Sequence, residues 1–178
     1  FPLSPALLIL PFPLGFRLTC YYYRKAYYRA FWLSPPACAV AEPHQRYTGE
    51  TKFPLILQNV HRYFLYFAIP LPFILFFDAI RGTQFPDGFG IGVGTLVLFS
   101  NSILLGLYTL SCHSCRHLCG GKLNRFSTAR TRYRLWKVVT KLNERHMALA
   151  WISLFGVALT DLYVRLVAMG TITDLRFF

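Results

Sequence analysis

Charged residues, and acidic residues above all, are scarce in this chain. Asp and Glu together number 7 among 178 residues, charged residues make up 15% of the sequence, and hydrophobic residues make up 54%. A typical soluble domain is about 25% charged and less apolar. This scarcity excludes an ordinary soluble domain and indicates a membrane protein.

Several other features are missing. The chain has no initiator Met, so we expect it to be part of a longer protein. The apolar opening FPLSPALLILPFPLG has no basic region and no small-residue cleavage site, which excludes a secretory signal peptide. We find no internal repeat and no low-complexity tract. The cysteines also lack the paired CxxC…CxxC spacing of a zinc site.

Four apolar stretches are predicted to cross a bilayer. Residues 55–77, 89–111 and 147–169 each exceed the roughly 20 residues that a spanning helix needs. Residues 1–19 are shorter and contain four prolines, so we expect them to form the kinked end of a fourth span. The sequence therefore predicts an all-α transmembrane helical bundle, a single domain over residues 1–178, with four spans visible.

Basic residues are concentrated between these spans. Six of the 19 Lys and Arg residues lie in residues 17–52, and nine lie in residues 116–145. By the positive-inside rule, segments 20–54 and 112–146 are predicted to be cytoplasmic. The net charge of +12 is then a sign of topology, and we expect no nucleic-acid partner. The string GFGIGVG, residues 88–94, is interpreted as a loop and a helix start, because no strand precedes it.

The side chains that most often bind metals gather on this predicted cytoplasmic side. All five cysteines and all five histidines lie there: Cys20, Cys38, His44, His61, Cys112, His113, Cys115, His117, Cys119 and His146. The densest stretch is TLSCHSCRHLCGG, residues 109–121. Ordinary packing of buried cysteines is the alternative interpretation, but so many residues of these two types together favour a metal site.

Helical geometry divides that dense stretch into two faces. At about 100° per residue, Cys112, Cys115 and Cys119 share one face of a continuous helix. His113 and His117 share another face and are spaced to chelate one metal ion. Either the two histidines join Cys20 and Cys38, or the thiols join histidines from elsewhere. Gly120 and Gly121 are expected to end the helix, and we also consider a break one turn earlier.

Two cofactors suit these residues. Two cysteines and two histidines would hold a Rieske-type 2Fe–2S cluster, whose imidazole ligands raise the reduction potential. Two histidines on facing helices would instead hold haem b, and His61 and His146 are the pair that position favours.

Aromatic and basic residues alternate in CYYYRKAYYRAFW, residues 20–32, and again in RYRLWK, residues 132–137. An interfacial aromatic belt with snorkelling cations explains this pattern. A docking face beside a quinone site is the alternative, because Tyr and Arg donors stabilise charge on a quinone carbonyl. In the last span, Asp161 and Arg165 are spaced to pair, which we favour over a proton path.

The sequence resembles a known family in several long motifs. TCYYYRKAYYRAFWLSPPACAVAEPH, NVHRY, LSCHSCRH, LNERHMALAW and the ending TDLRFF are similar to the membrane anchor of an actinobacterial, haem-less succinate dehydrogenase. The resemblance covers nearly the whole chain. It implies five spans in the full chain and a location in the bacterial plasma membrane, with the basic loops in the cytoplasm.

The resemblance also implies a function. The chain would relay electrons to quinone from a flavoprotein subunit with FAD and an iron–sulfur subunit with further clusters. Separately from the resemblance, a higher oligomer of the complex is a further expectation. A Rieske-type cluster would replace haem, with His113, His117, Cys20 and Cys38 as ligands and Cys112 and Cys115 as the alternative thiolates. The candidate quinone contacts are His61, Arg62, Tyr23 and Trp136. A b-type cytochrome anchor and a non-redox anchor or transporter are the alternative functions.

Overall fold

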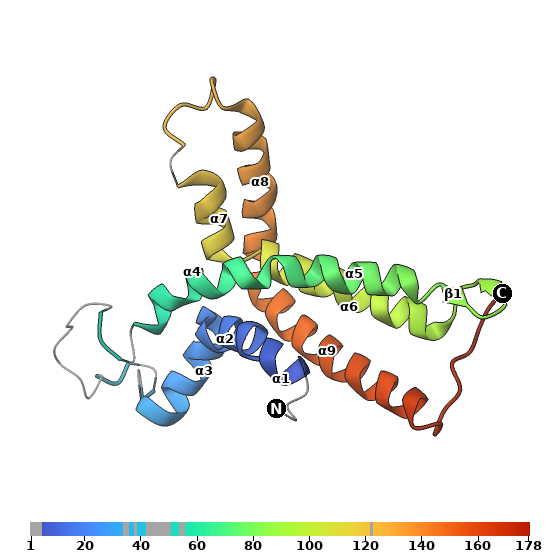
Figure 1. The fold of residues 1–178 in the computed structure, drawn as a ribbon. Coiled ribbons are helices and arrows are strands. Elements are labelled where there is room, and N and C mark those ends of the chain that lie inside the picture. The colour runs from blue at the N-terminus through green and yellow to red at the C-terminus, as the bar shows by residue number, and fades with distance from the viewer. Residues whose placement is uncertain (1–4, 34–35, 38, 42–50, 54–55, 122) are drawn as a thin grey trace. The chain divides into compact units, whose positions relative to one another are not determined.

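The structure is a computed structural model of the chain, and it is almost entirely helical (Figure 1). It describes residues 5–33, 36–37, 39–41, 51–53, 56–121 and 123–178. Two compact units are formed, residues 1–68 and residues 69–178. The predicted all-α fold class is confirmed, and the prediction of a single domain stays a prediction.

The first unit contains four helices: α1 (Pro5–Ile9), α2 (Pro11–Thr19), α3 (Tyr21–Trp32) and α4 (Leu57–Ala68). Pro11 begins α2, and the chain turns at Leu10 between α1 and α2, as the prolines predicted. Helices α2 and α4 pack together, with Phe12 stacked on Phe67 at a ring-centroid distance of 4.6 Å. Gly15 permits this close packing, because a Cβ atom there would overlap the Phe64 ring.

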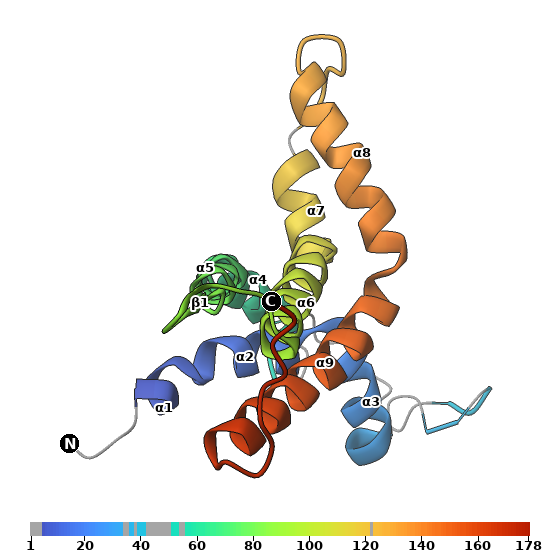
Figure 2. The same cartoon turned by 90° about the vertical axis from the view of Figure 1, so that its right-hand side faces the viewer.

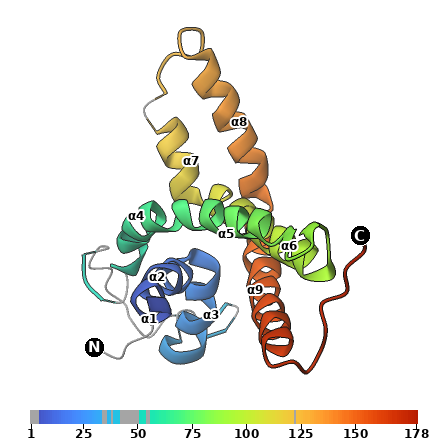
Figure 3. The ribbon, with the colours of Figure 1, turned by 45° about the vertical axis from the view of Figure 1, so that its right-hand side comes forward.

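The second unit contains five helices and a short hairpin: α5 (Pro70–Arg81), β1 (Gln84–Phe85), β2 (Gly88–Phe89), α6 (Val93–Leu110), α7 (His113–Gly120), α8 (Arg130–Glu144) and α9 (His146–Ala168). Helix α6 packs against both α5 and α9. Helices α7 and α8 lie side by side as a helical hairpin (Figure 2). Figure 3 shows that this hairpin projects away from α9.

Three of the predicted spans are confirmed by length and apolar composition. Residues Leu57–Arg81, Val93–Leu110 and His146–Ala168 are long and apolar enough to cross a membrane. The second span is predicted to end at residue 77, but it continues to Arg81, where a turn of Gly82 and Thr83 leads into β1. Leu7–Thr19 is a shorter apolar helix that matches the predicted kinked end of a span. Large apolar side chains on the spans, such as Phe73, Phe155 and Leu159, are exposed, as lipid contact requires.

The long helix expected through Cys119 breaks at Cys112. Helix α6 ends at Leu110, and Cys112 has an extended backbone with φ −63° and ψ 142° before α7 begins at His113. The Sγ atom of Cys112 accepts a hydrogen bond from the backbone N–H of Ser114, 3.3 Å away, and so caps α7. Cys112 therefore does not share a helical face with Cys115 and Cys119, although Gly120 and Gly121 end α7 as predicted.

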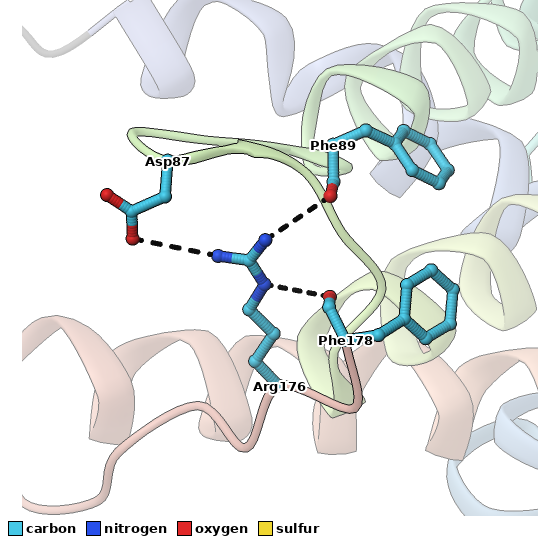
Figure 4. Close-up of polar contacts among 4 residues, drawn as sticks. All are labelled: Asp87, Phe89, Arg176 and Phe178. Carbon is cyan, nitrogen blue, oxygen red and sulfur yellow. Dashed lines mark hydrogen bonds and ion pairs between the residues drawn. The ribbon is translucent and has the colours of Figure 1, made fainter.

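The glycine-rich residues 88–94 pack against the C-terminal segment of the second unit, residues 174–178. The backbone N–H of Val93 donates to Leu175, and that of Phe177 donates to Ile91. A Cβ atom on Gly90, Gly92 or Gly94 would press on residues 174–178. Arg176 links the segment to the hairpin by donating a hydrogen bond to the carbonyl oxygen of Phe89, and its guanidinium lies 3.8 Å from the Asp87 carboxylate (Figure 4). Within the segment, Arg176 Nε donates to the carbonyl oxygen of Phe178. The predicted helix start is confirmed, because α6 begins at Val93. The expectation that no strand precedes the string is wrong, because β1 comes before it and its first two residues form β2.

Candidate functional site

The first unit contains a thiol and an imidazole on adjoining elements. Cys20 joins α2 to α3 with an extended backbone, φ −62° and ψ 136°, and its side chain is 0% exposed. His61, on α4, is 7% exposed. Its Nδ1 atom lies 2.8 Å from Oγ1 of Thr19, the residue before Cys20. The imidazole also stacks on Phe16, with ring centroids 4.6 Å apart and an interplanar angle of 9°.

The second unit contains the same arrangement on other helices. Cys112 joins α6 to α7 and is 1% exposed, and His146 begins α9 and is 2% exposed. The Nδ1 atom of His146 lies 2.7 Å from Oγ of Ser111, the residue before Cys112. The backbone of Ser111 is held in turn by Asn143, whose Nδ2 donates to its carbonyl oxygen at 2.7 Å.

The two arrangements share a short sequence pattern. FRLTC, residues 16–20, and YTLSC, residues 108–112, each place an aromatic residue, a hydroxyl residue and a cysteine at the same spacing. In each, the aromatic ring stacks on a histidine whose Nδ1 contacts the hydroxyl. We call Cys20 with His61 the first half-site, and Cys112 with His146 the second half-site. The expectation of no internal repeat is therefore wrong at this local scale. The repeat is hard to see in the sequence, because the histidine of each pair lies 42 or 35 residues away from the hydroxyl residue.

The histidines of α7 are arranged differently. His113 and His117 are both exposed. The His113 ring approaches His146, with centroids 6.4 Å apart, whereas the His117 ring lies against Gly121 at the other end of α7. Partial burial and the nearby charge of Arg116 lower the pKa of His113, which favours a neutral imidazole.

The remaining predicted ligands differ in burial. Cys115 is buried on α7, and burial together with Cys119 and Cys112 raises its pKa to about 12, so its thiol stays protonated near neutral pH. Cys119 is half-buried. Cys38 lies outside the described residues. Within the part of the chain that the structure describes, no group of three or more His, Cys, Asp or Glu side chains is placed to hold one metal ion.

The predicted quinone contacts lie in both units. In the first unit, Tyr23 is buried beside α2, and its hydroxyl accepts a hydrogen bond of 2.5 Å from Arg17. Burial is the main cause that raises the pKa of Tyr23, so its hydroxyl stays protonated. Arg62 is half-buried on α4. Trp136, in the second unit, packs on Gly120 and lies under the Arg116 guanidinium, 5.2 Å from the ring centroid.

The polar pair in the last span forms the predicted ion pair. Arg165 Nε donates to Asp161 Oδ2 at 2.7 Å, one helical turn away. Both side chains are exposed on the outside of α9.

Comparison with known proteins identifies the family. The family model of the actinobacterial succinate dehydrogenase subunit SdhC matches residues 1–170. The chain belongs to this family. The resemblance read from the motifs is therefore confirmed, and the chain is a membrane-anchor subunit of the actinobacterial succinate dehydrogenase type. None of the curated proteins matches the sequence.

A solved structure is similar to this SdhC-family chain. It is described as the Mycobacterium smegmatis Sdh1 complex in the apo form, and the chain it contains is 61% identical with a TM-score of 0.88. The similarity covers 97% of the present chain and 66% of the relative. The present chain thus spans just under two thirds of the relative's length.

Proposed function

We propose that this SdhC-family chain anchors a succinate:quinone oxidoreductase in the bacterial plasma membrane and relays electrons to quinone. The observation that supports the proposal is the pair of half-sites, one in each unit, each with a buried thiol and a buried imidazole. A purely structural anchor or a transporter has no need for two matched pairs of ligand-type side chains.

A Rieske-type 2Fe–2S cluster suits the chemistry of these residues. Each half-site taken by itself offers one thiolate and one imidazole to such a cluster: Cys20 and His61 in the first unit, and Cys112 and His146 in the second. Cys20 and Cys112 follow apolar helices, His146 begins a span, and His61 lies in the second turn of a span, all near ends that the charge pattern predicts to be cytoplasmic. When bound, such a cluster supplies one-electron transfer at a raised potential. The hydrogen bond that each imidazole makes through Nδ1 is typical of a metal-bound histidine.

This ligand set differs from those predicted from the sequence. His113 and His117, with Cys20 and Cys38 or with Cys112 and Cys115, remain predictions. We favour the half-sites because His113 and His117 are exposed, whereas the cysteine and the histidine of each half-site are buried.

Haem b held by His61 and His146 is the second candidate cofactor. The same Nδ1 hydrogen bonds suit axial haem ligands. The buried cysteine at each half-site favours the cluster, since haem bound by two histidines needs no thiolate.

The quinone would be reduced near the first half-site. Arg17 and Tyr23 form a hydrogen-bonded pair in the same unit as His61 and Arg62. These donors would stabilise negative charge on a quinone carbonyl. Reduction to the quinol takes two electrons and two protons, and the electrons come from succinate oxidised in a partner. Trp136, in the second unit, stays a candidate contact.

The partners would dock on the basic loops. These would be an iron–sulfur subunit, with further clusters, and a flavoprotein subunit with FAD. The α7–α8 hairpin carries exposed Arg130, Arg134, Lys137 and Lys141. Such a surface attracts an acidic protein face. We further propose that both basic loops are cytoplasmic and that the complex can form a higher oligomer.

The ligand assignment is tested in the purified complex. Cys20→Ser, Cys112→Ser, His61→Ala and His146→Ala should each abolish the electron paramagnetic resonance signal of a histidine-ligated cluster. Oxidation of succinate with a soluble dye should persist. The matched control is Cys119→Ser, which should keep the signal.

Two outcomes would contradict the proposal. A cluster that survives in the half-site variants but is lost in a His113→Ala/His117→Ala double variant would establish the ligands predicted from the sequence. Reduced-haem bands at one haem per chain in the optical spectrum would establish the b-type anchor.

A further inference from the structure

We propose that a groove between α6 and α9, within the second unit, receives one further transmembrane helix that hydrogen-bonds to the Asn101 amide. The helix would belong to the same polypeptide, in a part of it outside residues 1–178. The proposal concerns the packing of helices, so it does not depend on the cofactor, the quinone or the half-sites.

The groove runs along both helices. It has a volume of about 510 Å³, and the side chains that line it come from residues 93–104 of α6 and residues 156–166 of α9. At a rise of about 1.5 Å per residue, each helix contributes about 15 Å of its length to the groove. Most of the lining side chains are apolar, so the groove suits an apolar and elongated occupant.

Asn101 is the polar side chain that defines this groove. It lies eight residues after Val93 and nine before Leu110, the two ends of α6. It is therefore about 12 Å and 14 Å from the ends of this span. The residue lines the groove and is only 8% exposed, and its amide oxygen has no hydrogen-bond partner among the described residues. Because the hydrocarbon core of a bilayer contains no water to bind it, this amide requires a polar partner.

The open shape of the groove fits a helix better than a small molecule. Leu96 and Leu159 line it and yet are 49% and 65% exposed. A small-molecule site encloses most of its ligand, whereas this surface stays open along its length. Ser100 and Gly156 are small lining residues, which allow the backbone of another helix to approach closely. An acyl chain of a lipid would fill the groove, but it has no donor for the Asn101 oxygen.

The chemistry of the occupant follows from these contacts. It is an apolar helix long enough to cross the membrane, with Ser, Thr, Asn or Gln at the depth of Asn101. Such side chains form hydrogen bonds between helices in membrane proteins. Each of them has a hydrogen that can be donated to the Asn101 oxygen.

The similar solved structure supports the choice of the same polypeptide as the source. The match covers 97% of the present chain but 66% of the relative, so about a third of the relative has no counterpart in residues 1–178. A helix in such an additional part is tethered to α6 and α9. Tethering gives it a high effective concentration at the groove, which a separate molecule lacks.

Photocross-linking in the purified complex with the full-length chain tests the occupant. A photoreactive phenylalanine analogue replaces Leu159, which lines the groove. The matched control places the same analogue at Val164, which is 46% exposed on α9 but does not line the groove. We expect only the probe at Leu159 to join a transmembrane peptide of the same polypeptide outside residues 1–178. Mass spectrometry identifies the peptide, and a denaturing gel should show no doubling of the mass of the chain.

A substitution tests the hydrogen bond. Asn101→Leu removes the amide at nearly constant size, and the matched control is Ser102→Ala. Ser102 is also buried on α6, but it donates within the helix to the carbonyl oxygen of Phe99 at 2.9 Å. The yield of the Leu159 cross-link is measured as a denaturing detergent is added. We expect Asn101→Leu to lower the ratio of docked to undocked helix by about 3- to 10-fold, and Ser102→Ala to leave it unchanged.

Several outcomes would overturn the proposal. Cross-linking of the Leu159 probe only to lipid or quinone, to a second copy of the chain, to another subunit or to nothing would exclude the proposed helix. Equal ratios of docked helix in the Asn101→Leu and Ser102→Ala variants would exclude the hydrogen bond. None of these results bears on the proposed function, which is tested by the signal of the cluster, and loss of that function would leave the groove and its occupant unaffected.

Discussion

Tyr108 and His146 lie face to face, with ring centroids 5.3 Å apart and ring planes inclined by only 3°. Both side chains are buried where α6 ends and α9 begins. His146 follows the second basic segment, and Tyr108 lies at the end of the span that precedes that segment. The stack therefore joins the two spans on either side of the segment. In the second half-site, Tyr108 thus covers one face of the imidazole, and Ser111 contacts its Nδ1 atom.

The first prediction concerns this stack. Tyr108→Phe keeps the ring and should keep the stability of the second unit, whereas Tyr108→Leu should lower it. The contribution of an aromatic pair beyond its buried area is about 0.5–1.5 kcal/mol. Thermal unfolding of the purified complex measures the difference. Equal stability of the two variants would show that the stack contributes nothing.

The second prediction concerns Gly120, which supports the α7–α8 hairpin. A Cβ atom at Gly120 would overlap the Trp136 indole. Gly120→Ala should therefore separate the two helices at a cost of about 1–3 kcal/mol in the free energy of unfolding. Gly106→Ala is the control, because its nearest neighbour, Pro72 Cβ, would lie 3.8 Å away in ordinary contact. Limited proteolysis of the hairpin measures the effect. Equal rates of cleavage in the Gly120→Ala and Gly106→Ala variants would show that the contact between Gly120 and Trp136 does not hold α7 and α8 together.

The third prediction concerns the Asp174 carboxylate, which ties the C-terminal segment to α6. Its Oδ1 atom accepts hydrogen bonds from the Gly94 N–H at 2.8 Å and the Tyr163 hydroxyl at 2.7 Å. Asp174→Ala should speed hydrogen exchange at Gly94 and lower stability by about 1.5–3 kcal/mol. Asp87→Ala is the control. The Asp87 side chain is 88% exposed, and its contact with Arg176 is long, at 3.8 Å, so its loss should have little effect. Slow exchange at Gly94 in the Asp174 variant would contradict this role.

The fourth prediction concerns pH. The hydroxyl of Tyr27 on α3 donates to the carbonyl oxygen of Leu18 at 2.7 Å, and burial is the main cause that raises its pKa to about 12. The ordinary pKa of Tyr is about 10. The folded unit therefore holds this proton more tightly, so the stabilisation is complete below pH 10 and is lost as the pH rises from 10 to 12.

Tyr27→Phe tests this expectation. The variant should be slightly less stable at pH 8 and should show a weaker decline of thermal stability above pH 10. An identical alkaline decline in the variant and the unsubstituted chain would assign the effect to another group.

The predicted spans agree well with the structure because their signal is local. Runs such as residues 89–111 and 147–169 have an apolar length that a bilayer requires, and the observed helices Val93–Leu110 and His146–Ala168 lie almost within them. The end of α6 was predicted less well. Nothing in LSCHSC marks a helix end, because Ser111 and Cys112 break the helix through a bond to a distant histidine and a sulfur cap.

The sequence by itself determined that this chain is an apolar helical protein with its cysteines and histidines at one predicted side of the membrane. The composition, the lengths of the apolar stretches and the positions of the basic residues along the chain are enough for that conclusion. Only the tertiary structure decided which of them are paired and buried. His61 and His146 approach Thr19 and Ser111 from 42 and 35 residues away along the chain. Such contacts depend on helix packing, which no local pattern of residues specifies.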